Sequence, residues 1–566
     1  MKKFLYYVFA ISASIFSFSS CSLDEEIYSE VDATKFMNNA SEAEVVLNGV
    51  YRNMVTDELY GYHLSLLFPL STDIAQCEGN SSTSFREIPT NSFTTSNANV
   101  QGTWAMLYNS IYNANDFIER LEKKVGTYTQ ADKDLANLYV AEARALRAMY
   151  YFELVRWYGN IVLMTNTAQS SNHPSTFIQA DPKAVYEFIE KDLIFAIENL
   201  PYASDDTYRK NNKFRISRGA ALGLLTKVYA TWAGYPIKDE SKWENAAKTA
   251  KILIESGKHG LLSDYEQLWK NTCNGVWDSK ESLIEVSFYA PTVTGTNSED
   301  PCGRIGKWNG VQTTEIAGER GRNSGNVKVV FPFVKEWREK IGDLRCDLSV
   351  ANYKYNHNVA PGKVLWTIDD KNPDFEKAAA DEADPAKGQS KKQNYTPAKW
   401  DTEKYVESSN FLLNNDKSNV NWYILRYADV LLLYAEAINE WKGAPTEDAY
   451  TAINMVRRRG YGKPVDTANS QSDLTAGMNQ VEFRKAVWQE RAYELAFEGH
   501  RRQDLIRWGI YYETIIETSQ KVVDWYTNGN YVVRQFTEKG KHELFPIPLR
   551  DYDLMQPNCK QNPGWK

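Results

Sequence analysis

The stretch WQERAYELAFEGHRRQDLIRWG, residues 488–509, places three glutamates just before a group of arginines. Because an α-helix turns about 100° per residue, Glu490, Glu494 and Glu498 are expected to lie in one narrow stripe of a helix. Gly499 is expected to end that helix, since a left-handed C-terminal residue is most often glycine. A second short helix is expected to follow and to carry the remaining charges, which are Arg501, Arg502, Asp504 and Arg507.

This charge pattern fits two roles. A pair of carboxylates performs acid–base chemistry in glycosidases, and Glu490 with Glu494 or Glu498 would supply such a pair. Alternatively, the carboxylates and arginines form ion pairs that lock neighbouring helices together. A catalytic acid needs a raised pKa, whereas nearby arginines lower the pKa of a carboxyl group. We therefore favour a structural lock, whose predicted members are Glu490, Glu494, Glu498, Arg501, Arg502, Asp504 and Arg507.

The second half of this stretch, ELAFEGHRRQDLIRWG (494–509), is one of four segments that share a resemblance. The other three are ARALRAMYYFELVRWYG (143–159), LRYADVLLLYAEAINE (425–440) and LFPIPLRDYDLMQPNCKQNPGW (544–565). Together, and in this order, they resemble the SusD/RagB family, the surface lipoproteins of Bacteroidetes nutrient-uptake systems. The chain departs from the family pattern at residues 554–556, Leu-Met-Gln, where the family usually has an acidic residue or glutamine together with asparagine.

The N-terminus has the pattern of an export signal. Lys2 and Lys3 give it a positive end, and residues 4–15 form an apolar run that is too short to span a membrane. The residues up to Cys21 resemble a bacterial lipobox, and the acids that follow resemble the surface-export pattern of Bacteroidetes. We predict that residues 1–20 are a lipoprotein signal peptide and that Cys21 carries the lipid. The alternative is a plain cleaved signal in which Cys21 has no role.

Composition narrows the class of protein. The 566 residues carry a formal net charge of −8, which argues against nucleic acid as a partner. No HExxH, Walker or GxSxG motif occurs and no cysteine pairs with histidine at metal-binding spacing, so we expect no metal and no cofactor. The cysteines after Cys21 are expected to be free, buried thiols, with at least one unpaired because their number is odd. They are Cys77, Cys273, Cys302, Cys346 and Cys559.

Apolar residues recur at helical spacing over much of the chain. The predicted helices cover residues 32–54, 100–122, 132–158, 181–199, 217–233, 242–256, 421–441, 446–459, 481–498 and 501–520. The pair 217–233 and 242–256 resembles a tetratricopeptide hairpin, a unit that covers its apolar faces by stacking on its neighbours. Short strands are predicted at residues 282–289 and 364–368.

The predicted fold class is mainly α, with a helical-hairpin (tetratricopeptide-like) scaffold and an irregular loop-rich subdomain that contains short strands. The resemblance and the helical pattern divide the chain into an N-terminal helical region at residues 21–260, the loop-rich subdomain at 261–420 and a C-terminal helical region at 421–566. Residues 69–97 lack any period and form a predicted polar loop, which at such length is often functional. Residues 371–399 are rich in Lys, Asp, Ala and Pro and are predicted to be an excursion from the fold.

A sugar has apolar C–H faces and a polar rim, so a binding site needs an aromatic plate together with amide, carboxylate or arginine groups. The resemblance implies that the glycan surface is formed by loops of the N-terminal region and of the middle subdomain. For any single aromatic residue in these loops, packing in the core is the competing interpretation. The candidate ligand-binding residues are Asp73, Asn80, Phe85, Arg86, Trp277, Tyr289, Trp308, Arg320 and Trp337.

The resemblance implies a binding protein rather than an enzyme. It implies a lipid-anchored protein on the outside of the outer membrane, which passes oligosaccharides to a SusC-like TonB-dependent transporter. Three alternatives remain open: an uptake lipoprotein that binds peptides, a surface glycosidase that uses the glutamates of residues 490–498, and a helical-repeat scaffold without a ligand.

Overall fold

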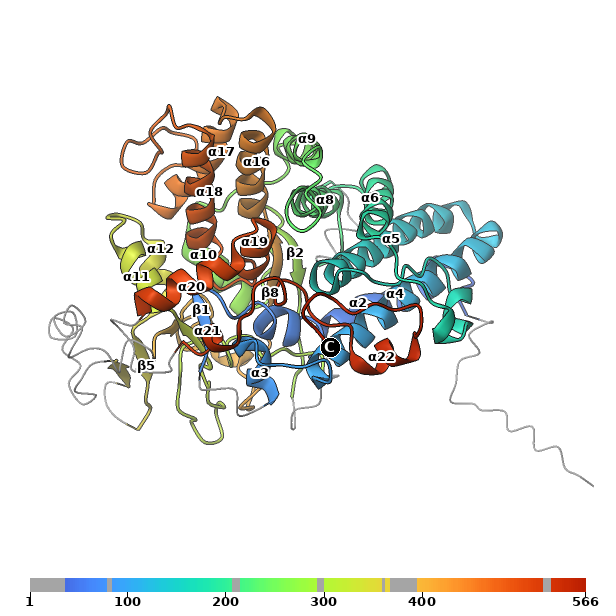
Figure 1. The fold of residues 1–566 in the computed structure, drawn as a ribbon, viewed down its shortest axis with the longest axis horizontal. Helices are drawn as coiled ribbons and strands as arrows, with labels where there is room; N and C mark the ends of the chain where they lie inside the picture. The colour runs from blue at the N-terminus through green and yellow to red at the C-terminus, as the bar shows by residue number, and fades with distance from the viewer. Residues whose placement is uncertain are drawn as a thin grey trace, which may run out of the picture.

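The computed structural model describes residues 36–78, 84–205, 214–292, 300–358, 362–366, 394–522 and 531–566. Figure 1 shows helices over most of the body, with the short strands on the side away from α4 and α5. Three predictions lie outside the described residues: the signal peptide with Cys21, the candidate Asn80, and residues 371–393 of the predicted excursion.

The N-terminal helices pack in sequence order. They are α2 (Ala40–Arg52), α4 (Ala98–Lys124), α5 (Gln130–Tyr158), α6 (Pro182–Asn199), α8 (Arg218–Ala233) and α9 (Lys242–Glu255). α4 packs against α5, α5 against α6, α6 against α8 and α8 against α9, and Figure 1 shows this row. The helices predicted for this region are confirmed, although α2 begins later than expected.

Local sequence determines where these helices begin and end. The side chain of Asn97 accepts hydrogen bonds from the first turn of α4, and that of Thr129 accepts one from the first turn of α5. Asp181 caps α6 ahead of Pro182, whose missing N–H suits the first helical position. α5 ends at Gly159, where φ is +66°, a backbone conformation that favours glycine.

The C-terminal region is a second group of helices. They are α16 (Tyr427–Lys442), α17 (Glu447–Gly460), α18 (Gln480–Glu494), α19 (Arg501–Arg507), α20 (Tyr511–Val522), α21 (Val533–Phe536) and α22 (Leu549–Leu554). α16 packs on α9 as well as on α17 and α18, so it joins the two helical regions. Its residues are buried from Tyr427 to Asn439, which explains why its sequence is apolar around most of the helix.

The loop-rich subdomain forms short antiparallel strand pairs, some of them with strands from the regions on either side of it. Among the described residues, β1 (Ala75–Cys77) pairs with β3 (Val327–Val329), β2 (Ser282–Val286) with β8 (Trp422–Arg426), β4 (Val350–Ala351) with β7 (Thr396–Pro397), and β5 (Tyr353–Tyr355) with β6 (Lys363–Leu365). Short helices lie between them: α3 (Ser84–Thr90), α10 (Tyr265–Cys273), α11 (Phe331–Arg338), α12 (Arg345–Ser349) and α15 (Thr402–Tyr405). The β2–β8 pair contacts α8 and so ties this subdomain to the helices.

Three of the predicted C-terminal helices differ from the observed ones. The predicted helix 421–441 begins only at Tyr427, because residues 422–426 pair with β2 as strand β8. A short buried apolar run suits a strand as well as a helix, and only the presence of a pairing partner distinguishes them. The predicted helix 481–498 ends at Glu494, and the predicted helix 501–520 breaks near Gly509, where φ is +73°.

The prediction of a polar surface loop at residues 69–97 is wrong. Most of the described residues in this range are buried, and they include β1 and α3. Hydroxyl groups satisfy the buried backbone here: Thr72 Oγ1 accepts hydrogen bonds from the N–H groups of Ile74 and Ala75. Asn91 donates from Nδ2 to the Tyr511 hydroxyl, 2.9 Å away on α20. A Ser- and Thr-rich composition therefore does not by itself indicate an exposed loop, because hydroxyl groups also form hydrogen bonds with buried irregular backbone.

One large hydrophobic cluster runs through both helical regions and into the loop-rich subdomain. Its largest fully buried rings are Trp157, Trp232, Trp269, Trp337 and Trp400. None of the described helices combines the length and the apolar character that crossing a bilayer requires. The predicted fold class, mainly α with an irregular subdomain of short strands, is confirmed.

Candidate functional site

Glu490, Glu494 and Glu498 converge inside the protein, where they are 1%, 0% and 2% exposed. α18 carries the first two, and the turn that follows it carries Glu498. Gly499 has the expected left-handed conformation, with φ +82°, although the helix has already ended at Glu494. Carboxylates removed from water in this way are tolerated only when cations and hydrogen-bond donors surround them.

Arginines from distant parts of the chain surround the first two carboxylates. Arg345, at the start of α12, donates from Nη1 to Glu490 at 2.6 Å and to Glu494 at 3.0 Å. Arg459, near the end of α17, donates from Nη2 to Glu494 Oε1 at 2.6 Å. Both arginines are at most 1% exposed, so these ion pairs are shielded from water and salt.

Glu498 and Glu281 extend the same group. Arg426, the last residue of β8, donates from Nε to Glu498 at 2.7 Å and from Nη1 to Glu281 at 2.8 Å. Arg459 also donates to Glu281, at 2.9 Å. Lys399 Nζ lies 2.6 Å from Glu498, and burial lowers the pKa of Lys399 to about 8. We call the whole group the buried charge cluster: Glu281, Arg345, Lys399, Arg426, Arg459, Glu490, Glu494 and Glu498.

The electrostatics of the cluster do not suit acid–base catalysis by its glutamates. Burial alone would raise the pKa of Glu494, but the surrounding arginines outweigh it and hold that pKa well below its ordinary value. Burial acts on Glu498 in the same way, and Arg426 with Lys399 lowers its pKa. A glycosidase acid must carry a proton and must reach the substrate. The glycosidase hypothesis for these glutamates is therefore wrong.

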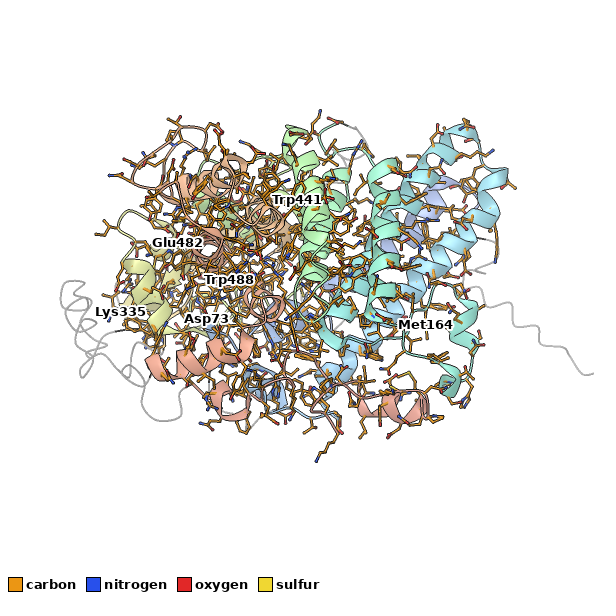
Figure 2. All side chains as sticks on the ribbon, turned by 45° about the horizontal axis from the view of Figure 1, so that its top comes forward. Asp73, Met164, Lys335, Trp441, Glu482 and Trp488 are labelled. Carbon is orange, nitrogen blue, oxygen red and sulfur yellow. The ribbon has the colours of Figure 1, made fainter. Side chains whose placement is uncertain are left out.

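The arginines expected as partners from the same stretch bind other groups. Arg501 binds Asp73 at 2.6 Å, and its Nη1 donates to the backbone oxygen of Trp488, which Figure 2 shows near Asp73. Arg507 binds Glu436 of α16 at 2.7 Å. These are inter-element ion pairs like those of the buried charge cluster, but they belong to different carboxylates.

Arg502 also differs from expectation, whereas Asp504 pairs within the stretch, with Arg491 and Arg507. Arg502 is 0% exposed and has only neutral partners among the described residues: it donates to Asn91 Oδ1 and to the backbone oxygen of His542, both at 3.0 Å. Asp504 accepts from Arg491 Nε at 2.9 Å. The turn after Glu494 redirects the chain, so the second helix no longer continues the stripe of the first. The charge pattern predicted burial and pairing, but not which residues pair.

A second candidate site lies in the loop-rich subdomain, around Tyr289. This residue follows β2 and is 69% exposed, the largest exposed fraction of any aromatic side chain among the described residues. Its backbone is held on both sides, because the N–H of Tyr289 donates to the Pro301 oxygen at 2.7 Å and the N–H of Ala290 donates to Asn419 Oδ1 at 2.8 Å. An exposed ring on a fixed backbone is the arrangement that stacking on a ligand requires.

Residues 403–419 connect Tyr289 with two other candidates. Arg320 donates to Glu403 at 2.5 Å and lies over the ring of Phe411, 4.3 Å from its centroid. Trp277 is partly exposed and follows Asn274 by three residues. The side chain of Asn274 donates to the Tyr405 oxygen at 2.7 Å and accepts from the N–H of Glu407. We call this area the loop surface: Trp277, Tyr289, Arg320, Phe411 and the exposed Leu413.

A charged link fixes the loop surface to the N-terminal region. Asp57 accepts from Lys417 Nζ at 2.6 Å and from Arg304 Nη2 at 2.8 Å. Arg304 also lies over the ring of Tyr62, 4.7 Å from its centroid. Trp308 packs edge-on against Tyr62, with ring centroids 4.7 Å apart. One buried carboxylate thus orients two segments of the subdomain at once.

The other candidates are placed differently. Trp308 and Trp337 are 5% and 0% exposed, so the expectation that they present a ring to a ligand is wrong. Trp337 instead stacks on Tyr493 of α18, with ring centroids 5.0 Å apart. Phe85 is partly buried edge-on against Trp308, and Arg86 lies over the Phe85 ring. Asp73 is engaged by Arg501, as described above.

Phe411, Leu413, Asp57 and Lys417 were missed from the sequence. The stretch SSNFLLNNDKSNVN, residues 408–421, places a short apolar run between asparagines, which is the one local signal of a ligand loop that it carries. The contribution of Asp57 has no local signal, since its partners lie about 250 and 360 residues further along the chain.

Neither candidate site contains metal-binding chemistry in the described residues, where no three His, Cys, Asp or Glu side chains gather in a suitable group. The cysteines are free and buried, as predicted: Cys77, Cys273, Cys302, Cys346 and Cys559.

Comparison with known families matches both ends of the chain. A family model described as "SusD family" matches residues 334–565. A second, described as "Starch-binding associating with outer membrane", matches residues 23–230.

Individual relatives match along nearly the full length. A SusD homolog from Bacteroides thetaiotaomicron, solved by crystallography, is 61% identical with a TM-score of 0.91, and the match covers 96% of this chain and 100% of that one. SusD-like protein P25 from Formosa agariphila is 25% identical, over 98% of this chain and 97% of the relative. Surface glycan-binding protein A from Bacteroides thetaiotaomicron, in complex with laminarihexaose, has the same fold at 19% identity, with a TM-score of 0.65 over 92% of this chain and 99% of that one.

Proposed function

Because this chain belongs to the SusD family, we propose that it binds oligosaccharides through the loop surface and delivers them to a SusC-like TonB-dependent transporter. The description of the second matching family names starch binding and association with the outer membrane. Surface glycan-binding protein A shares the fold and has been crystallised with laminarihexaose. No bond of the ligand is made or broken in this proposal.

The observation that carries the proposal is the exposed ring of Tyr289. Its neighbour Ala290 packs in one small cluster with Leu412, and the next residue back, Phe411, carries the guanidinium of Arg320 over its ring. Arg320 in turn pairs with Glu403, so the same loops supply an apolar plate and charged hydrogen-bonding groups. A pyranose ring offers C–H groups to such a plate and hydroxyl groups to its rim. The lipid anchor at Cys21 places the protein on the outer membrane in this proposal, facing the cell exterior.

The loop surface is tested by replacing its ring. Calorimetry of the purified chain without its signal peptide is expected to detect binding to one or more of a panel of glucans. In Tyr289→Ala we expect affinity to fall about 10-fold or more, because central aromatic anchors dominate binding energy. The matched control is Tyr112→Ala on α4, where the tyrosine is also exposed, at 43%, but lies outside the loop surface. We expect its affinity to equal that of the unchanged protein.

Three results would contradict the proposal. Equal affinity for glucan in Tyr289→Ala and Tyr112→Ala would show that the loop surface is not the binding site. Binding of peptides but of no glycan would replace oligosaccharides by peptides as the cargo. Failure to co-purify with any TonB-dependent transporter from outer membranes would separate glycan binding from transport.

A further inference from the structure

A cavity on the helical side of the molecule, away from the loop surface, has no role in the proposed function. Its volume is about 360 Å³, within the range of about 300–1,000 Å³ that small-molecule sites occupy. It lies where α5 ends, α6 begins and α8 passes into a loop, and Figure 1 shows these helices side by side. α19 and the C-terminal tail close it, so five separate segments of the chain build one hollow.

Tyr186 of α6 lines this cavity with a hydroxyl that the protein does not use. The residue is 3% exposed, and its hydroxyl has no hydrogen-bond partner among the described residues. One face of its ring is covered by Trp232, with centroids 5.3 Å apart. Burial holds the pKa of Tyr186 well above its ordinary value, so the hydroxyl keeps its proton and can donate. A ligand oxygen in the cavity can accept that hydrogen bond.

Two further side chains that line the cavity have hydrogen-bond donors available for a ligand. Arg156, near the end of α5, donates from Nε and Nη2 to Glu153, at 2.9 and 2.5 Å, and its Nη1 amino group makes no hydrogen bond to the described part of the chain. Gln503 of α19 is 7% exposed, and among the residues that the structure describes its Nε2 has no hydrogen-bond partner. Donors from three different helices therefore meet at one cavity.

The charges around the cavity are already balanced. Arg156 is neutralised by Glu153, and Arg507 by Glu436 and Asp504 at 2.7 and 2.9 Å. An anionic ligand would find no cation left to bind and would meet the carboxylate of Asp181, which also lines the cavity. The balance favours a neutral ligand that is rich in hydroxyl groups.

The cavity also has an apolar part, besides polar lining residues such as Asn160, Thr231 and Asn562. Tyr235, Pro182 and Pro236 contribute it, together with Leu544 of the C-terminal tail. Flat apolar surfaces opposite hydrogen-bond donors match a pyranose, whose C–H faces and hydroxyl rim are separated in the same way. We propose that this cavity is a second saccharide site, which takes a single neutral sugar unit and uses Tyr186, Arg156 and Gln503 to bind its hydroxyl groups.

Monosaccharides test this site separately from the loop surface. Saturation-transfer NMR and calorimetry with glucose, galactose and mannose are expected to show saturable binding of at least one of them. Tyr186→Phe removes a single hydroxyl and is expected to weaken that binding about 3- to 10-fold. The matched control is Tyr434→Phe on α16, because Tyr434 is also buried, at 6% exposed, but donates its hydroxyl to Asp448, 3.2 Å away. We expect Tyr434→Phe to bind like the unchanged protein.

A blocking variant covers the case in which Tyr186→Phe folds poorly. Asn160 is exposed and lines the cavity, so Asn160→Trp adds a large ring at its edge and is expected to abolish monosaccharide binding. Tyr289→Ala is expected to leave monosaccharide binding intact even where it abolishes binding of longer glucans. The proposal is overturned if none of the three sugars binds, or if binding is unchanged in both Tyr186→Phe and Asn160→Trp.

Discussion

At the scale of single residues, Glu494 shows how much a buried carboxylate depends on its partners. It accepts hydrogen bonds from Arg345, Arg426 and Arg459, at 3.0, 3.1 and 2.6 Å, and is 0% exposed. The four side chains come from α18, α12, β8 and α17. Removing the negative charge of Glu494 therefore leaves the positive charges of three buried arginines only partly neutralised.

We expect Glu494→Gln to lower the free energy of unfolding by about 3 kcal/mol, because uncompensated buried charge is more costly than a missing contact. The shift of the urea midpoint measures it. Glu447→Gln is the control, since Glu447 is exposed in the first turn of α17 and its loss is expected to change stability by less than about 0.5 kcal/mol. A change in Glu494→Gln as small as that of the control would show that the cluster adds little to stability.

Glu285 of β2 is a buried carboxyl group that pairs with no cation in the described part of the chain. It accepts hydrogen bonds from Asn421 Nδ2 and from the Ser282 hydroxyl, both at 2.8 Å. Burial raises its pKa from 4.5 to about 7. Below about pH 4.5 the group is neutral in both the folded and the unfolded chain. Between pH 4.5 and about 7 only the unfolded chain ionises, so the free energy of unfolding falls as the pH rises.

The contribution of Glu285 to this fall is on the order of 3 kcal/mol. We expect Glu285→Gln to remove it, so that the variant gains stability relative to the unchanged protein when the pH is raised from about 5 to about 8. Urea midpoints at both pH values measure the gain, with Glu447→Gln again as the control. An equal pH dependence in the two variants would assign the effect to other groups.

At the scale of elements, local capping determines where the helices begin, and α18 is an example. The Asn479 side chain caps it by accepting hydrogen bonds from the N–H groups of Val481 and Glu482, and the Glu482 carboxylate accepts one from the N–H of Asn479. α18 then carries Glu490 and Glu494 into the buried charge cluster. The start of the helix and the position of its carboxylates are thus linked.

We expect Asn479→Ala to lower stability by about 1 kcal/mol, as removal of an N-terminal cap usually does. Thr446→Ala is a close control, because Thr446 occupies the same position before α17 but makes no capping hydrogen bond with its side chain. Thermal unfolding of both variants gives the comparison. If the two variants lose the same stability, the capping interaction of Asn479 is not what stabilises α18.

Elements also show where local pattern is insufficient. Residues 422–425 are apolar and lie just before a helix, yet with Arg426 they form β8 because β2 lies within pairing distance. Residues 501–520 split into α19 and α20. In both cases the backbone follows a partner or a turn that a single-sequence period does not reveal.

At the scale of the whole molecule, the chain ties distant segments together with ion pairs. Asp57 connects the N-terminal region to Arg304 and Lys417, and Asp73 connects it to Arg501. The first link reaches the segments that carry the loop surface, and the second reaches α19 in the C-terminal helical region. The proposed function requires this assembly to be held at the outer membrane, which is the predicted role of the lipid on Cys21.

We expect Cys21→Ser to release the protein from the membrane fraction, because a soluble body with no acyl chains has nothing to hold it there. Cell fractionation measures how much of the protein stays with the membrane, and labelling with a palmitate analogue detects the lipid. Both are done in cells that express the full chain. Cys559→Ser is the control, as Cys559 is buried and free. If the unchanged protein takes up no label and fractionates like Cys21→Ser, the lipid prediction is wrong and the plain cleaved signal is favoured.

The sequence alone predicted where the helices lie, where they are capped, and that the acid-rich stretch is buried. These features depend on residues close together in the sequence, because periodicity and capping are local. The pairing of Glu494 with Arg345, Arg426 and Arg459 does not, since each partner lies on another element and is 35 to 149 residues away. The same holds for the aromatic candidates for ligand binding. Nothing in the sequence distinguishes Tyr289 from Trp337, but Tyr289 is 69% exposed and Trp337 is 0% exposed. The sequence was enough to show which charged groups need a counter-ion and which apolar groups need to be buried. Which residues pair with them or bury them was settled by the tertiary structure, because burial and charge compensation depend on all the segments that pack around a residue.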